Sequence, residues 1–209
     1  MLDDVTDFCR LFLLRHPELD SEARSRAVGS GECGLSRRGK ARVLAWIKLL
    51  EGQPLDEIHC SDQPQAAHPA NGLAQAISLE ARTSEALRDQ DMGLWQGRLW
   101  EDLLAEDPDR VKEFFANFAE VVPPEGESLG QAVERVMGWW NEAGKNFAGK
   151  TIAIVGPGSV LSGFTAAMLG MRLSRCISLH LPHGGVGVLD VFANGVRLSA
   201  WNIDALSDQ

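Results

Sequence analysis

The chain has 209 residues, 44% of them hydrophobic and 23% charged, with a formal net charge of −9. This composition is that of a globular protein, long enough for one large domain or two small ones. The negative charge argues against nucleic acid and anionic membranes as partners. No stretch approaches the roughly 18 apolar residues that span a bilayer.

The first residues and the cysteines favour a reducing compartment as the expected location. The acidic start, residues 1–4, lacks the basic region and apolar core of a signal peptide, so we expect a cytoplasmic location. The four cysteines are widely scattered, with no pair at metal-ligand spacing, and are predicted to be reduced thiols. They are Cys9, Cys33, Cys60 and Cys176. We therefore expect no metal and no cofactor.

Strand-like and helix-like patterns alternate along the chain. Strands are predicted over residues 11–14, 57–60, 77–81, 151–155, 177–181, 186–192 and 196–201. Helices are predicted over residues 37–50, 65–76, 99–118 with an interruption near Pro108, 128–147 and 160–169. Ser36 is a suitable cap for the first helix, and Asn194-Gly195 indicates a hairpin between the last two strands.

This alternation predicts an α/β fold, a three-layer α/β/α sandwich with a mostly parallel central sheet. We found no internal repeat and no low-complexity linker, which favours a single domain over residues 1–209. The irregular stretch 88–127 contains Trp95 and Trp100. We interpret it as an insertion over the active-site edge of the sheet.

Arg15 and His16 directly follow the first predicted strand. In an open α/β sheet the ligand site lies at the carboxyl ends of the strands, so this pair is expected where chemistry is done. A guanidinium can hold phosphate oxygens, and an imidazole can attack phosphorus. Taken alone, the pair is better explained as an ordinary strand end with two solvated residues.

Further motifs follow this pair in a fixed order. They are Arg15-His16-Pro17; Arg26, Gly29 and the Leu-Ser-Arg-Arg-Gly of 35–39; Cys60-Ser61-Asp62; the Leu-Arg-Asp-Gln-Asp-Met-Gly-Leu-Trp-Gln-Gly of 87–97; and the Pro-Glu-Gly-Glu-Ser of 124–128. Each motif is weak by itself. Together, and in this order, they resemble the histidine phosphatase superfamily, in its phosphoglycerate mutase-like branch, over nearly the whole chain.

The resemblance implies a mechanism. His16 would attack a phosphomonoester and carry the phosphoryl group as phosphohistidine, while Arg15 holds the phosphate oxygens. Asp89, where the family has its acid, would protonate the leaving oxygen and later activate water. The substrate-binding positions carried over are Arg15, Arg26, Ser61, Gln65 and Gly158.

Three phosphate-facing positions depart from the family pattern. Pro157 stands where the family has its second catalytic histidine, and proline has neither an imidazole nor a backbone N–H. Gln65 aligns with the family's second arginine, and Glu22 aligns with an asparagine. All three changes weaken anion binding, so we expect a fold of this family with little or no phosphatase activity.

Two functions stay open. The first is a nearly inactive domain that binds an anionic metabolite or a protein partner through the pocket where the family binds phosphate. A homodimer is one assembly that such a chain could form. The second is a working phosphomonoesterase on a small metabolite, similar to α-ribazole phosphatases. His68 or His183 would then have to replace the missing imidazole, whereas the simpler expectation is a helix-surface His68 and a turn His183.

Overall fold

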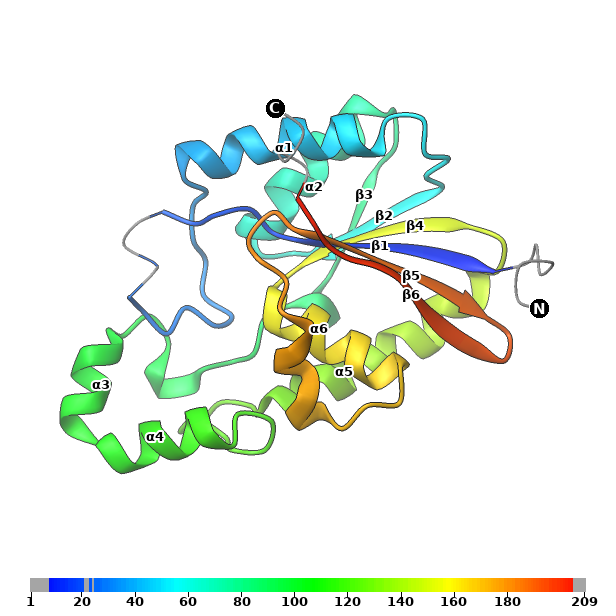
Figure 1. Cartoon of the computed structure of the whole chain (residues 1–209). Coiled ribbons are helices and arrows are strands. Elements are labelled where there is room, and N and C mark those ends of the chain that lie inside the picture. The colour runs from blue at the N-terminus through cyan, green and yellow to red at the C-terminus, as the bar shows by residue number, and fades with distance from the viewer. Residues whose placement is uncertain (1–7, 21–22, 24, 205–209) are drawn as a thin grey trace.

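A six-stranded sheet forms the centre of the structure, a computed structural model that describes residues 8–20, 23 and 25–204 (Figure 1). The strand order is β3-β2-β4-β1-β5-β6. The strands are β1 (Cys9–Arg15), β2 (Glu57–Ser61), β3 (Ala81–Ser84), β4 (Thr151–Gly156), β5 (Val186–Phe192) and β6 (Gly195–Ile203). The prediction of a mostly parallel sheet is confirmed, because β1 to β4 and β6 run in one direction and only β5 runs antiparallel, to its neighbours β1 and β6.

The register between β1 and β4 determines which residues meet at the sheet edge. Arg10 pairs with Thr151 at one end, and Arg15 pairs with Gly156 at the other. The His16 amide then donates to the Gly156 carbonyl at 2.9 Å. The loops that follow β1 and β4 therefore leave the sheet side by side, as expected for the carboxyl ends of neighbouring parallel strands.

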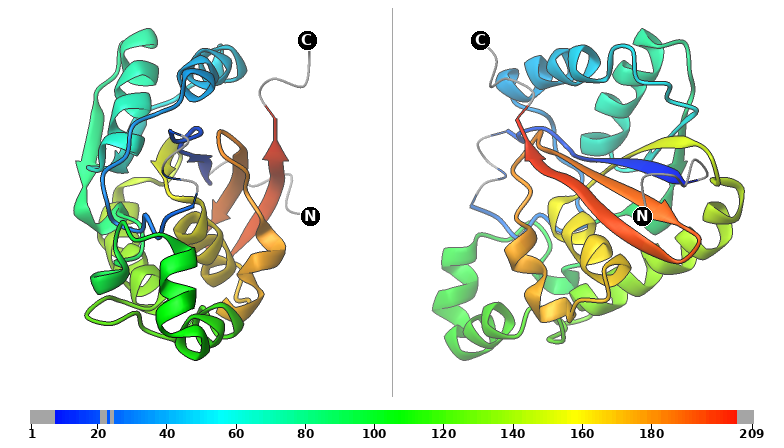
Figure 2. Two further views of the ribbon diagram at one scale, coloured as in Figure 1. Left: turned by 90° about the vertical axis from the view of Figure 1, so that its left-hand side faces the viewer. Right: turned by 45° about the vertical axis from the view of Figure 1, so that its right-hand side comes forward.

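Helices cover both faces of the sheet, which confirms the three-layer prediction (Figure 2). One face packs against α1 (Arg37–Leu50) and α2 (Pro64–Ala76) through an apolar cluster that contains Trp46 and Leu73. The other face packs against α5 (Leu129–Ala143) and α6 (Gly158–Met168) through a cluster around Phe164. As predicted, Ser36 caps α1, its Oγ accepting from the Gly39 amide at 2.9 Å.

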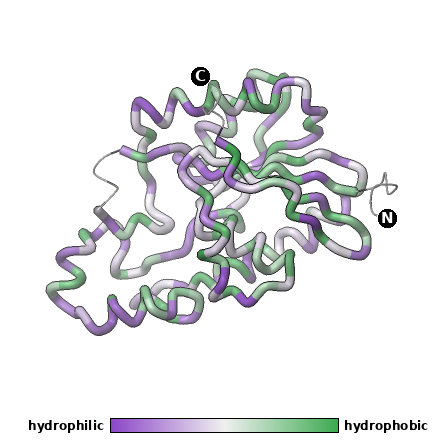
Figure 3. Tube along the Cα trace, viewed as in Figure 1, coloured by the Kyte–Doolittle hydropathy of each residue, from purple (hydrophilic) through white to green (hydrophobic). Residues whose placement is uncertain are grey.

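The stretch 88–127 lies at the end of the sheet where β1 ends (Figure 1). It contains α3 (Trp100–Glu106) and α4 (Pro108–Ala116), along which hydrophilic and hydrophobic residues alternate (Figure 3). Their apolar residues form a small cluster of their own with Ala27, Met92 and Trp95. That this segment is an insertion over the active-site edge of a single domain stays a prediction.

Two of the predicted strands are wrong. The strand expected over 77–81 begins at Ala81, because α2 runs on to Ala76 and the chain turns at Ser78, whose φ is 60°. The strand expected over 177–181 is instead a 3-10 helix, Leu173–Leu179. Both were short apolar runs, whose periodicity does not distinguish a strand from a buried turn.

The predicted helices are correct in kind, and the one expected over 37–50 has those bounds in the structure, whereas the others differ at their ends. The helix expected over 99–118, with an interruption near Pro108, is divided at Asp107. The Asp107 side chain accepts from the Arg110 amide and so caps α4, which begins at Pro108. The helix expected over 128–147 ends at Ala143 and continues as a 3-10 turn. Within the described residues, no helix is both long and apolar enough to cross a membrane.

Candidate active site

His16 is buried just past the end of β1, with 6% of its surface exposed. Its Nδ1 lies 3.0 Å from the carbonyl oxygen of Pro17. A carbonyl only accepts, so this contact assigns the proton to Nδ1 and leaves the lone pair on Nε2. Burial, helped by the neighbouring Arg15 and His183, lowers the pKa of His16 to about 3, although the hydrogen bond with Pro17 opposes this shift. The imidazole is therefore neutral at pH 7, the form in which it can act as a nucleophile.

Arg15 reaches from the end of β1 toward the loop before β5. Its Nη1 donates to the Leu181 carbonyl at 2.7 Å, and its Nη2 lies 3.0 Å from Nε2 of His183. Its Nε is buried without a hydrogen-bond partner. Burial lowers the pKa of Arg15, yet a guanidinium stays protonated in proteins. Arg15 is therefore a buried cation held mainly by neutral groups.

Asp89 lies in the loop after β3 and reaches the first turn of α6. Its Oδ1 accepts from Ser159 Oγ at 2.9 Å and from the Gln90 amide at 2.8 Å. Burial raises the pKa of Asp89, and these hydrogen bonds with the charges of Arg15 and Arg135 oppose that rise only in part. A carboxyl with a raised pKa holds its proton more readily, which is the property a general acid needs.

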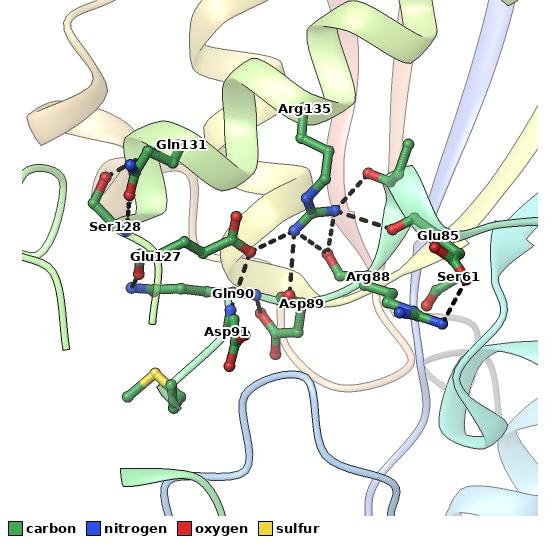
Figure 4. Close-up of polar contacts among 12 residues, drawn as sticks. Ser61, Glu85, Arg88, Asp89, Gln90, Asp91, Glu127, Ser128, Gln131 and Arg135 are labelled. Carbon is green, nitrogen blue, oxygen red and sulfur yellow. Dashed lines mark hydrogen bonds and ion pairs between the residues drawn. The ribbon is translucent and has the colours of Figure 1, made fainter. Parts of the chain in front are cut away.

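Arg135 of α5 holds the loop that carries Asp89 (Figure 4). Its guanidinium donates to the carbonyls of Ala86 at 2.7 Å, Arg88 at 3.2 Å and Asp89 at 3.3 Å, and to Glu127 at 2.6 Å. The sequence analysis missed this arginine. One arginine on an amphipathic helix gives no local signal of such a role.

A cavity of about 280 Å³ joins these groups. Its lining residues are Arg15, His16, Glu18, Leu19, Ala23, Val28, Gln65, Asp89 and His183. The structure thus brings together the three predicted catalytic residues and Gln65. Among the described lining residues, Arg15 is the only cation, and two carboxylates, Glu18 and Asp89, face the same space.

The other predicted binding residues lie around this cavity rather than in its lining. Arg26 is exposed, and its Nη1 donates to the Gly97 carbonyl at 2.9 Å. Ser61 is fully buried at the end of β2 and donates to Gln63 Oε1 at 3.2 Å. Gly158 begins α6 against Arg15, where an added Cβ would come within 2.6 Å of the arginine Cδ. A side chain at position 158 would therefore displace Arg15.

The side chain of Gln65 is already engaged. Its Nε2 donates to the Gly31 carbonyl at 2.8 Å, and its Oε1 accepts from the Cys33 amide at 3.3 Å. The amide group therefore ties α2 to the loop before α1. Pro157 is the N-cap residue of α6 and offers no side-chain hydrogen bond. Glu22, the third departure from the family pattern, lies outside the described residues.

The two histidines considered as replacements lie in different places. His68 is exposed on α2, as expected. His183 differs from the expectation of a simple turn residue, because it lines the cavity with its ring centroid 5.2 Å from that of His16. Since Arg15 can only donate, Nε2 of His183 is the acceptor in their contact. No cluster of metal-binding side chains occurs among the described residues.

Known proteins share both the sequence pattern and the fold. The chain is 27% identical over 180 residues to phosphoserine phosphatase 1 of Hydrogenobacter thermophilus, covering 86% of this chain and 85% of that protein. It is 23% identical over 197 residues to the adenosylcobalamin/α-ribazole phosphatase of Salmonella typhimurium, covering 94% and 98%.

Two solved structures have the same fold. The α-ribazole phosphatase from Shigella flexneri superposes with a TM-score of 0.85 at 23% identity, over 93% of this chain and 96% of that one. A mycobacterial glucosyl-3-phosphoglycerate phosphatase superposes with a TM-score of 0.86 at 24% identity, over 94% and 100%. Residues 11–204 match the histidine phosphatase superfamily (branch 1), and the chain belongs to that family.

Proposed function

We propose that the protein binds a phosphomonoester in the cavity of Arg15 and His16 and that its phosphatase activity is absent or greatly reduced. The observation that carries this proposal is the charge of the cavity. Among the described lining residues, Arg15 is the only cation, and it shares the cavity with the carboxyl groups of Glu18 and Asp89. One guanidinium can hold a phosphate, but the carboxyl groups oppose the further negative charge that develops in the transition state.

The engaged side chain of Gln65 supports the same conclusion. Both ends of its amide are hydrogen-bonded to the loop of Gly31 and Cys33, so it has little capacity left for a phosphate. Pro157 adds no donor from the end of β4. Removing one preorganised donor to a developing negative charge typically costs about 10²–10³ in rate. Two such losses leave little catalysis, even if they are less than additive.

Nε2 of His183 does not restore the missing donor in this arrangement. This nitrogen accepts a hydrogen bond from Arg15, so it has no proton to give to a phosphoryl oxygen. The contact also uses one of the arginine's donors. Phosphate would have to compete with His183 for Nη2 of Arg15.

A second candidate function is slow phosphomonoester hydrolysis through phospho-His16. Two observations favour it: the Nδ1–H tautomer of His16 leaves Nε2 ready to attack, and the pKa of Asp89 is raised as in a general acid. The substrate would be a small metabolite, in keeping with relatives named as phosphoserine and α-ribazole phosphatases.

Hydrolysis of p-nitrophenyl phosphate separates the two candidates. We expect wild-type protein to be no faster than His16→Ala, and a Gln65→Arg/Pro157→His variant to be at least about 10²-fold faster than wild type. Gln53→Arg/Pro54→His is the matched control, because it makes the same exchanges at an exposed turn. Urea unfolding of each variant shows that the fold is retained.

Each outcome decides between the candidates. Wild-type turnover far above that of His16→Ala, with a phosphohistidine at residue 16 found by mass spectrometry, would establish the enzyme. A folded Gln65→Arg/Pro157→His variant without any gain would contradict our account of why activity is lost. Arg15→Met should abolish binding of inorganic phosphate under the first proposal, and unchanged binding would reject it.

A further inference from the structure

A second cavity of about 260 Å³ adjoins the first, and Arg15 lines both. It lies between the end of α4 with the segment that follows it, the first turns of α5 and α6, and the 3-10 helix before β5. Most of its wall is apolar: Phe115, Phe118, Leu129, Cys176, Ile177 and Leu181.

Ser159 connects this apolar cavity to the proposed general acid. It lines the cavity, and its Oγ donates to Oδ1 of Asp89 at 2.9 Å. The apolar cavity is therefore on the Asp89 side of the phosphate pocket. An ester oxygen placed at Asp89 would direct the rest of its alcohol toward Ser159 and beyond. Gly158 leaves this route open, because it has no side chain where it adjoins Arg15.

The polar groups of this cavity are largely engaged within the protein. Ser162 Oγ donates to the Leu179 carbonyl at 2.7 Å, and Nη1 of Arg15 donates to the Leu181 carbonyl. His180 is a solvent-exposed residue of the lining. A polar sugar or amino acid would thus lose hydration for few new hydrogen bonds, whereas an apolar group loses none.

We propose that this cavity receives an apolar, ring-sized alcohol portion of the phosphomonoester whose phosphate binds at Arg15 and His16. This inference rests on the proposed function and names its ligand class. An engineered apolar cavity of about 150 Å³ holds benzene, so the present space has room for a fused ring system. Exposed Phe115 and Ile177, 57% and 71% accessible, extend the apolar surface to solvent.

Calorimetry with the full-length protein tests the proposal with three probes: methyl phosphate, 2-naphthyl phosphate and 2-naphthol. Burying a naphthyl ring removes enough apolar surface from water for roughly a tenfold or greater gain in affinity. We therefore expect 2-naphthyl phosphate to bind at least about tenfold more tightly than methyl phosphate. We also expect 2-naphthol to compete with it.

Two exposed residues of the lining give a variant that should fold normally. Phe115→Gln/Ile177→Gln is expected to reduce the preference for the naphthyl ester to about threefold or less, with methyl phosphate binding unchanged. Leu94→Gln/Leu44→Gln is the matched control, because these leucines are 58% and 70% exposed and line neither cavity. The control is expected to keep the wild-type preference.

The outcomes separate this inference from the proposed function. Equal affinity for the two esters, each lost in Arg15→Met, would overturn the apolar subsite and leave phosphate binding intact. Methyl phosphate binding that is the same in wild type and Arg15→Met would reject the proposed function instead. Naphthol that binds without displacing 2-naphthyl phosphate would also overturn the inference, because the two cavities would then not hold one ligand.

Discussion

Each end of β1 carries an arginine, but the two ends differ in how they compensate its charge. At the start of the strand, Nε and Nη2 of Arg10 donate to both carboxylate oxygens of Asp190, at 2.7 and 3.1 Å. Asp190 is fully buried and also accepts from Arg197 and Ser199. At the end of the strand, Arg15 has a carbonyl and an imidazole as hydrogen-bond partners, and its Nε has none.

The pKa values of the charged groups at the two ends of β1 also shift in different directions. The hydrogen bond with Asp190 raises the pKa of Arg10, whereas burial lowers the pKa of Arg15. Although burial alone would raise it, hydrogen bonds from Arg10, Ser199 and Arg197 hold the pKa of Asp190 at about 2. A cation with its anion already in place stabilises the fold. A buried cation with neutral partners is a place for an anion to bind.

The largest expected effect concerns acid stability at the end of β1. The unfolded chain protonates His16 below its ordinary pKa of 6.5, but the folded protein does so only near 3. The free energy of unfolding therefore falls as pH drops from 6.5 toward 3. Between pH 7 and pH 4, His16→Gln is expected to lose about 3 kcal/mol less stability than wild type in urea titrations. His68→Gln, at an exposed site, is the control.

A second prediction concerns the start of β1. Asp190→Asn leaves Arg10 and Arg197 without their anion, and we expect a loss of about 2–3 kcal/mol in unfolding free energy at pH 7. Since its folded pKa is depressed, this stability is present above pH 3.8 and is lost as pH falls toward 2. If Asp190→Asn were as stable as wild type, the ion pair at the start of β1 would not stabilise the fold, and the contrast with Arg15 would be lost.

Removing Arg15 is expected to lower the free energy of unfolding much less than Asp190→Asn does. Arg15→Met deletes a cation that has no carboxylate as a hydrogen-bond partner. The apolar side chain of methionine replaces much of the packing of the arginine stem. We expect unfolding free energy within about 1 kcal/mol of wild type, together with loss of phosphate binding. A loss of stability as large as that of Asp190→Asn would show that Arg15 is structural.

The smallest expected effect is at His183. If this imidazole competes with phosphate for Arg15, His183→Ala should raise the affinity for inorganic phosphate by a few-fold, about 1 kcal/mol or less. Asn71→Ala on α2, away from the cavity, serves as the comparison. Weaker phosphate binding or slower hydrolysis in His183→Ala would instead identify His183 as the replacement for the missing histidine.

Much of this molecule could be predicted from local sequence. The run of residues 11–14 before Arg15, the Ser36 cap and the Asn194-Gly195 hairpin follow from periodicity and turn chemistry, and the structure confirms all three. The order of the motifs also indicated the family. Arg15 and His16 were expected at the site because they follow a strand of a parallel sheet, and Asp89 because the family resemblance implied it; all three line one cavity.

Other features depended on contacts between distant parts of the chain. The sequence by itself determined most of the elements and the residues at the ends of β1 and β4, since these depend on neighbours within a few positions. Only the tertiary structure decided that His183 accepts from Arg15, 168 positions away, and that Arg135 holds the Asp89 loop. It also decided that Gln65 is engaged with Gly31. Hydrogen bonds of this kind depend on packing between layers, which no local pattern records.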